Sequence, residues 1–126
     1  MNTLIDPETV PVTSSRLRLQ IDIMSKFNDP NDITVENLTS NYTASELETI
    51  WQVAHFTTKN FTLRNVAMEA QLSLLDVSDN KRDQIFRYLI DVNKTDKIKV
   101  AEYIDQYEKD YPSKSGIVSA LKKRYL

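Results

Sequence analysis

The chain has 126 residues, 40% of them hydrophobic, which is enough for one folded domain with its own core. It contains no cysteine, which excludes disulfides and a cysteine nucleophile, and its single glycine leaves few positions for hairpin turns or phosphate-binding loops. The net charge of -2 is unevenly distributed: residues 1–111 hold all eighteen acids against twelve lysines and arginines, whereas residues 112–126 hold four basic residues and no acid.

The first part of the chain lacks a clear periodic pattern. Residues 1–12 contain two prolines, so we expect an extended N-terminal arm, followed by a single helical domain over residues 13–126. Apolar residues within 14–27 alternate as in a strand but also form two helical ridges. We favour a helix there, because no second alternating segment exists to pair with a strand.

Helix signals recur along the rest of the chain. Thr34 can cap a short helix, and TASE at residues 43–46 has the form of a capping box. Further caps are expected at Ser78 or Asp79 and at Ser113. The apolar faces that follow the helical spacing are Val35, Leu38 and Tyr42; Leu47, Ile50, Trp51, Ala54 and Thr58; Leu63, Val66, Ala67 and Ala70; Ile85, Phe86, Leu89 and Val92; Val100, Tyr103, Ile104, Tyr107 and Tyr111; and Ile117, Val118, Leu121 and Tyr125. These patterns predict an all-α fold, a compact bundle of five to seven short helices with helix-turn-helix-like units.

The stretch FTLRNVAMEAQLS at residues 61–73 resembles the helix-turn-helix of many bacterial repressors. Ala70 is the small residue of its first helix, Gln71 stands where a turn glycine is usual, and Ser73 stands where the second helix is capped. The resemblance implies that the following residues, 74–79, face DNA. Their sequence LLDVSD offers apolar groups and carboxylates, which repel phosphates and supply few base contacts. This segment therefore fits the shape of a DNA reader but not its charge.

The basic end of the chain is a second place where an anion can bind. We expect the last helix to begin after Ser113, so that its first backbone amides and a lysine can hold a phosphate. Basic residues near its C-terminus also complement the helix dipole. The candidate nucleic-acid or anion contacts are Lys114, Ser115, Lys122, Lys123 and Arg124. A DNA-binding transcriptional regulator that uses this helix is therefore the alternative function.

The sequence offers little catalytic chemistry. His55 is the only histidine, and a half-buried histidine near a helix end is much commoner than a catalytic base. Acidic pairs such as Glu102 with Asp105 are interleaved with apolar residues, as on a solvated helix face. We expect neither enzymatic activity nor a metal or cofactor. Because the chain also lacks a signal peptide and a long apolar run, we expect a cytoplasmic protein.

The leading functional prediction is a non-catalytic regulatory or adaptor protein. Tyr103, Tyr107 and Tyr111 form a stripe at four-residue spacing, and tyrosines combine apolar area with a polar tip, which suits protein interfaces. Leu74 and Leu75, between two predicted helices, form a second apolar surface. We expect these side chains to bind another protein or a second copy of the chain.

Overall fold

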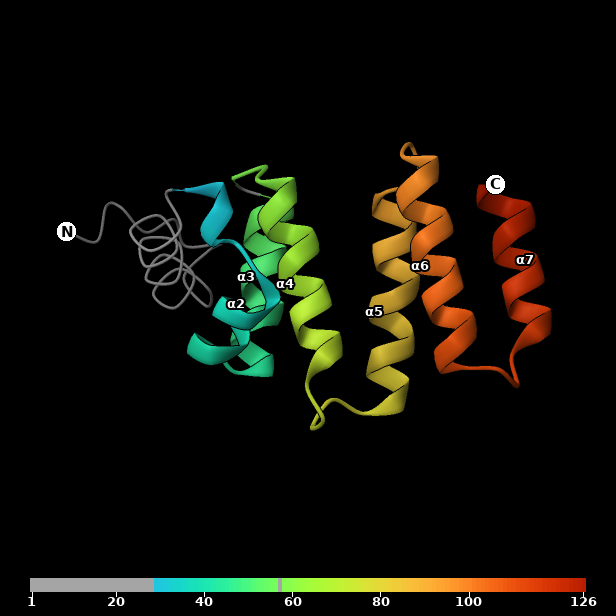
Figure 1. Cartoon of the computed structure of the whole chain (residues 1–126), viewed down its shortest axis with the longest axis horizontal. Coiled ribbons are helices and arrows are strands. Elements are labelled where there is room, and N and C mark those ends of the chain that lie inside the picture. Colours follow the sequence, from blue (N-terminus) through green and yellow to red (C-terminus); the bar gives the residue numbers. More distant parts are fainter. Residues whose placement is uncertain (1–28, 57) are drawn as a thin grey trace, which may run out of the picture. The chain divides into compact units, whose positions relative to one another are not determined.

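The computed structural model describes residues 29–56 and 58–126 (Figure 1). The regular structure of these residues is entirely helical, which confirms the predicted all-α fold class. The predicted arm over residues 1–12 and the predicted helix over residues 14–27 lie outside the described residues. The chain divides after Asp76 into two compact units, each described by itself below. A single domain over residues 13–126 stays a prediction.

The described residues of the first unit form a short 3₁₀ helix and three α-helices: η3 (Pro30–Asp32), α2 (Val35–Asn41), α3 (Ala44–Phe56) and α4 (Phe61–Ser73). The Thr34 hydroxyl caps α2 by accepting a hydrogen bond from the Asn37 amide at 3.1 Å. The capping box is also confirmed, since the Thr43 amide donates to Glu46 Oε1 at 2.9 Å and the Glu46 amide donates to Thr43 Oγ1 at 3.2 Å.

The core of the first unit lies where α4 packs against α3 and α2, and α3 and α4 run side by side in Figure 1. Its fully buried side chains include Leu38, Leu47, Ile50, Ala67, Met68 and Ala70. Thr58, predicted to extend the buried face of α3, is instead exposed. The prediction failed there because α3 ends at Phe56, so the helical spacing no longer applies to Thr58.

The segment that resembles a helix-turn-helix is one continuous helix, α4. Gln71, predicted to occupy the turn, is a buried residue inside α4, and Ser73 ends that helix rather than capping the next. The connection begins at Leu74, and the following helix is capped by Ser78, whose hydroxyl accepts from the Lys81 amide. The predicted position of the turn is therefore wrong, although short connections do join α4 to the helix over Asp79–Val92 and that helix to the one over Lys97–Asp110.

The second unit contains three helices: α5 (Asp79–Val92), α6 (Lys97–Asp110) and α7 (Ser115–Tyr125). They run alternately up and down in Figure 1, with α6 packed against both neighbours. Ser113 does not cap α7 as predicted, because the Lys114 amide donates to the Tyr111 carbonyl in a preceding turn. The helix consequently begins at Ser115 without a side-chain cap.

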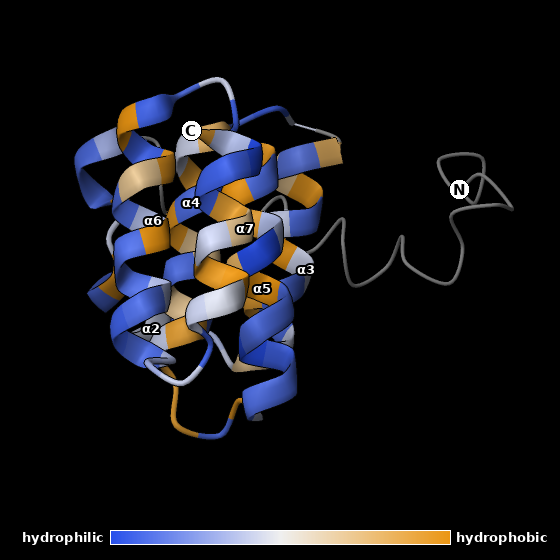
Figure 2. Ribbon diagram, turned by 90° about the vertical axis from the view of Figure 1, so that its right-hand side faces the viewer, coloured by the Kyte–Doolittle hydropathy of each residue, from blue (hydrophilic) through white to orange (hydrophobic). Residues whose placement is uncertain are grey.

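Each helix of the second unit buries one apolar face. Figure 2 shows hydrophobic and hydrophilic residues on the same helices, as expected of amphipathic segments. The buried side chains include Ile85, Phe86, Leu89, Val100, Ile104, Tyr107, Val118 and Tyr125. Among the described residues, no helix has both the length and the apolar character needed to cross a membrane.

Candidate protein-interaction surfaces

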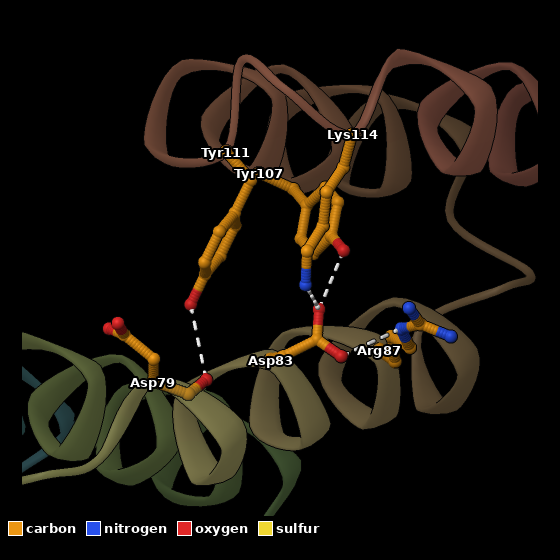
Figure 3. Close-up of polar contacts among 6 residues, drawn as sticks. All are labelled: Asp79, Asp83, Arg87, Tyr107, Tyr111 and Lys114. Carbon is orange, nitrogen blue, oxygen red and sulfur yellow. Dashed lines mark hydrogen bonds and ion pairs between the residues drawn. The ribbon is translucent and has the colours of Figure 1, made fainter.

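The tyrosine stripe on α6 is mostly an internal feature of the second unit. Tyr107 is fully buried, and its hydroxyl donates to Asp83 Oδ1 at 2.6 Å (Figure 3). Its ring packs edge-on against Phe86, with ring centroids 5.7 Å apart. Burial is the main reason why the pKa of Tyr107 is raised, and its hydrogen bond to Asp83 adds to the effect. Tyr107 is therefore a core residue that exposes no surface, so its burial does not favour the predicted role in an interface, which stays a prediction.

The other two tyrosines of the stripe are half-buried. The Tyr111 hydroxyl lies 3.5 Å from the Asp79 carbonyl oxygen, and its ring lies against that of Tyr107 (Figure 3). Tyr103 lies one turn closer to the start of α6, with the Lys99 ammonium 6.0 Å from its ring centroid. The three tyrosines do not form a continuous exposed surface, because Tyr107, the middle one, packs against α5.

Asp83, on α5, links α5 to α6 and to the residue that precedes α7. Besides Tyr107, its carboxylate contacts Lys114 Nζ at 3.5 Å and Arg87 Nε at 3.2 Å (Figure 3). We call Asp83, Arg87, Tyr107 and Lys114 the Asp83 cluster. Lys114 was expected to be the main cation of a phosphate site at the start of α7. In the structure its ammonium group already contacts the Asp83 carboxylate and lies over the Tyr111 ring, so its charge is already paired.

The end of α7 is fixed by two hydrogen bonds of Tyr125. Its hydroxyl donates to Asp91 Oδ1 at 2.9 Å, and its carbonyl oxygen accepts from Lys97 Nζ at 2.6 Å. Lys122 lies 3.7 Å from a Glu108 oxygen, while Lys123 and Arg124 are exposed. Of the predicted anion contacts, Ser115 is exposed as well, but the structure places it beside a lysine that is already paired.

Five large apolar side chains are exposed among the described residues: Phe56, Phe61, Leu75, Ile98 and Leu126. Leu75, at 97% exposure, lies on the surface as predicted, whereas Leu74 is half-buried and does not form an exposed pair with it. Phe56 and Phe61 were not predicted as surface residues. The sequence did indicate that Phe56 is exposed, because it does not follow the three-and-four spacing predicted for the buried face of α3.

Phe56 and Phe61 flank the connection between α3 and α4. His55 contacts both rings, with centroid distances of 4.6 Å to Phe56 and 6.1 Å to Phe61. The Arg64 guanidinium lies 4.5 Å from the Phe61 ring centroid, and its Nη1 lies 3.1 Å from His55 Nδ1. Because a guanidinium only donates, Nδ1 accepts and the imidazole is neutral in this arrangement. We call these four residues the aromatic surface.

The aromatic surface is locally cationic within an acidic unit. Residues 49–68 include Lys59 and Arg64 but no aspartate or glutamate. The pKa of His55 is lowered, first by burial and then by repulsion from Arg64 and Lys59. Arg64 is itself buried, at 4% exposure, and His55 is half-buried, so the part of this surface open to a partner consists mainly of the two phenylalanine rings, which suit contact with an apolar partner surface.

We expect the first unit to lose stability as the pH falls below 6.5. A lowered pKa means that the unfolded chain binds a proton at His55 more readily than the folded chain does, so acid favours unfolding. Urea unfolding followed by the fluorescence of Trp51, the single tryptophan, measures this at about pH 7.5 and about pH 5.5. His55→Gln should lose a smaller part of its stability over this interval. An equal loss of stability in the wild type and in His55→Gln would mean that His55 does not cause the pH dependence.

No protein-family model matches the chain, and comparison with curated proteins and with solved structures finds no match. Within residues 29–56 and 58–126, no group of three or more histidines, aspartates or glutamates is placed to hold a metal ion.

Proposed function

We propose that the protein is a non-catalytic regulatory or adaptor protein that binds another protein through the aromatic surface of its first unit. The observation that carries this proposal is the exposure of Phe56 at 60% and Phe61 at 47%, side by side with His55 and Arg64. Tyr42 and Trp51 are buried in the core of this unit, whereas these two phenylalanines are largely exposed.

The aromatic surface favours binding because its side chains are already partly ordered in the folded chain, so binding costs less conformational entropy. Phe61 is held by Arg64, and Phe56 is held edge-on by His55. A side chain that is fixed before binding loses less conformational entropy in the complex. Exposed aromatic side chains also contribute disproportionately to protein interfaces. The expected partner presents an apolar pocket or helix face.

The test compares three full-length proteins as baits for capture from cells that express this chain. The double variant Phe56→Ser/Phe61→Ser removes the aromatic surface, and Leu75→Ser removes an exposed apolar side chain elsewhere in the same unit. A partner should be retained by the wild type and Leu75→Ser, and should bind at least about tenfold more weakly to the double variant when purified. Equal retention by all three proteins would contradict the proposal.

The alternative function is a DNA-binding regulator that uses the basic C-terminal helix. It is supported by Lys123 and Arg124, which are exposed on α7 and form no ion pair with a carboxylate among the described residues. It is weakened by Lys114 and Lys122, whose ammonium groups already contact carboxylates. Binding of mixed-sequence duplex DNA that weakens steeply with salt, and is lost when Lys122, Lys123 and Arg124 become serine, would favour it.

A further inference from the structure

The start of α6 and the end of α7 meet at one end of the second unit. The hydrogen bond from Lys97 Nζ to the Tyr125 carbonyl joins them, and Figure 1 shows the end of α7 near the turn between α5 and α6. The basic residues of this end are Lys94, Lys97, Lys99, Lys123 and Arg124. We call this set the basic end.

The cations of the basic end differ from several others in the same unit. Arg87, Lys114 and Lys122 each contact a carboxylate. None of the five cations of the basic end forms an ion pair with a carboxylate among the described residues. The two acids nearby have other partners, because Asp91 accepts from Tyr125 and Asp96 caps α6 by accepting from the Lys99 amide. Both acids keep their negative charge, because their hydrogen-bond donors are neutral, and the five cations of the basic end outnumber them by three.

Local helix stability explains only part of this charge, because Lys123 and Arg124 complement the C-terminal end of the α7 dipole but Lys97 and Lys99 have no such role. Lys97 and Lys99 lie in the first turn of α6, where the helix dipole disfavours cations. Between them, Ile98 exposes 76% of its surface instead of packing in the core. An exposed apolar side chain at an end rich in cations provides both long-range attraction for an acidic surface and apolar area to bury on contact.

An acidic surface of this kind is present on the same chain. Residues 29–76 hold seven acids against two basic residues, a net charge of -5, whereas Val77–Leu126 hold eleven basic residues against eight acids, a net charge of +3. Residues 29–58 contain five acids and no lysine or arginine. Asp32 and Glu36, near the start of α2, are exposed.

We propose that the basic end of one copy docks on the acidic η3 and α2 region of a second copy, so that the protein self-associates head to tail. The two surfaces are different, which makes the contact heterologous and permits rings or short open chains. A nucleic acid is disfavoured as the occupant, because the net charge of the first unit repels a polyanion. The inference does not depend on the aromatic surface.

The test uses full-length charge-reversed variants in sedimentation experiments at about 20 mM and about 500 mM salt. One variant is Lys94→Glu/Lys99→Glu/Lys123→Glu, which spares the Lys97 hydrogen bond. The other is Asp32→Lys/Glu36→Lys. The wild type should associate at low salt and dissociate at high salt. Each variant alone should associate at least about tenfold more weakly, and their equimolar mixture should associate again, because both contacts become complementary.

Two controls separate this inference from the other proposals. Lys109→Glu reverses an exposed cation near the end of α6, outside the basic end, and should associate like the wild type, as should Phe56→Ser/Phe61→Ser. A wild type that stays monomeric at low salt would overturn the inference, as would a mixture that fails to associate. Duplex DNA that binds a monomeric wild type, but not the lysine-reversed variant, would overturn it in favour of a nucleic-acid partner.

Discussion

Asp83→Ala is expected to lower the free energy of unfolding of the second unit by about 2 to 4 kcal/mol. The substitution leaves the buried Tyr107 hydroxyl without its acceptor and removes the carboxylate that Arg87 and Lys114 share. The lost hydroxyl partner dominates, because the two cations reach solvent and their ion pairs contribute less. Urea unfolding followed by far-ultraviolet circular dichroism measures the change, with Trp51 fluorescence reporting the first unit in the same samples.

A double-mutant cycle separates the hydrogen bond from general loss of packing. Tyr107→Phe alone removes the hydroxyl but keeps the ring against Phe86, so it should cost about 1 kcal/mol. Asp83→Ala/Tyr107→Phe should be less destabilised than the sum of the single variants, since neither protein group is then left unsatisfied. Strict additivity would mean that the two side chains do not interact in solution. Asp79→Ala, at the start of the same helix, is the matched control.

Features that depend on a few neighbouring residues could be predicted from the sequence. The capping box is one example, because Thr43 and Glu46 satisfy each other's amides within a single turn. The buried faces of α5 and α6 are another, because the helical period fixes which residues share a side. Ser113 failed as a cap because a turn that closes on Lys114 delays the helix by one residue.

Features that depend on contacts between helices could not be predicted. Tyr107 and Asp83 are 24 positions apart, and periodicity states only that Tyr107 lies on an apolar face. Whether that face meets solvent or another helix is decided by packing. The basic end has the same origin, since Lys97 and Tyr125 are 28 positions apart and meet only because α6 and α7 pack together. The charge asymmetry was visible in the sequence, but its clustering was not.

Gln71→Gly tests whether residues 61–73 form one continuous helix or the helix and turn of a helix-turn-helix motif. The substitution is expected to lower the free energy of unfolding of the first unit by about 2 to 4 kcal/mol. A glycine at this position would suit the turn of that motif. In the structure Gln71 is buried in α4, where its Oε1 accepts from Trp51 Nε1 at 2.8 Å and its Nε2 donates to Glu48 Oε1 at 3.3 Å. The substitution removes both bonds, opens a cavity and places glycine within a helix.

Gln71→Ala separates the two causes, because alanine removes the side chain but keeps a high helix propensity. It should retain about 1 kcal/mol of the stability that the glycine variant loses. Both variants should also shift the Trp51 emission in the folded state, since the indole loses a buried acceptor. A glycine variant as stable as the wild type would mean that residues 61–73 contain a turn after all. If both variants lose stability, and the glycine variant loses more than the alanine variant, then α4 is a continuous helix whose buried face includes Gln71.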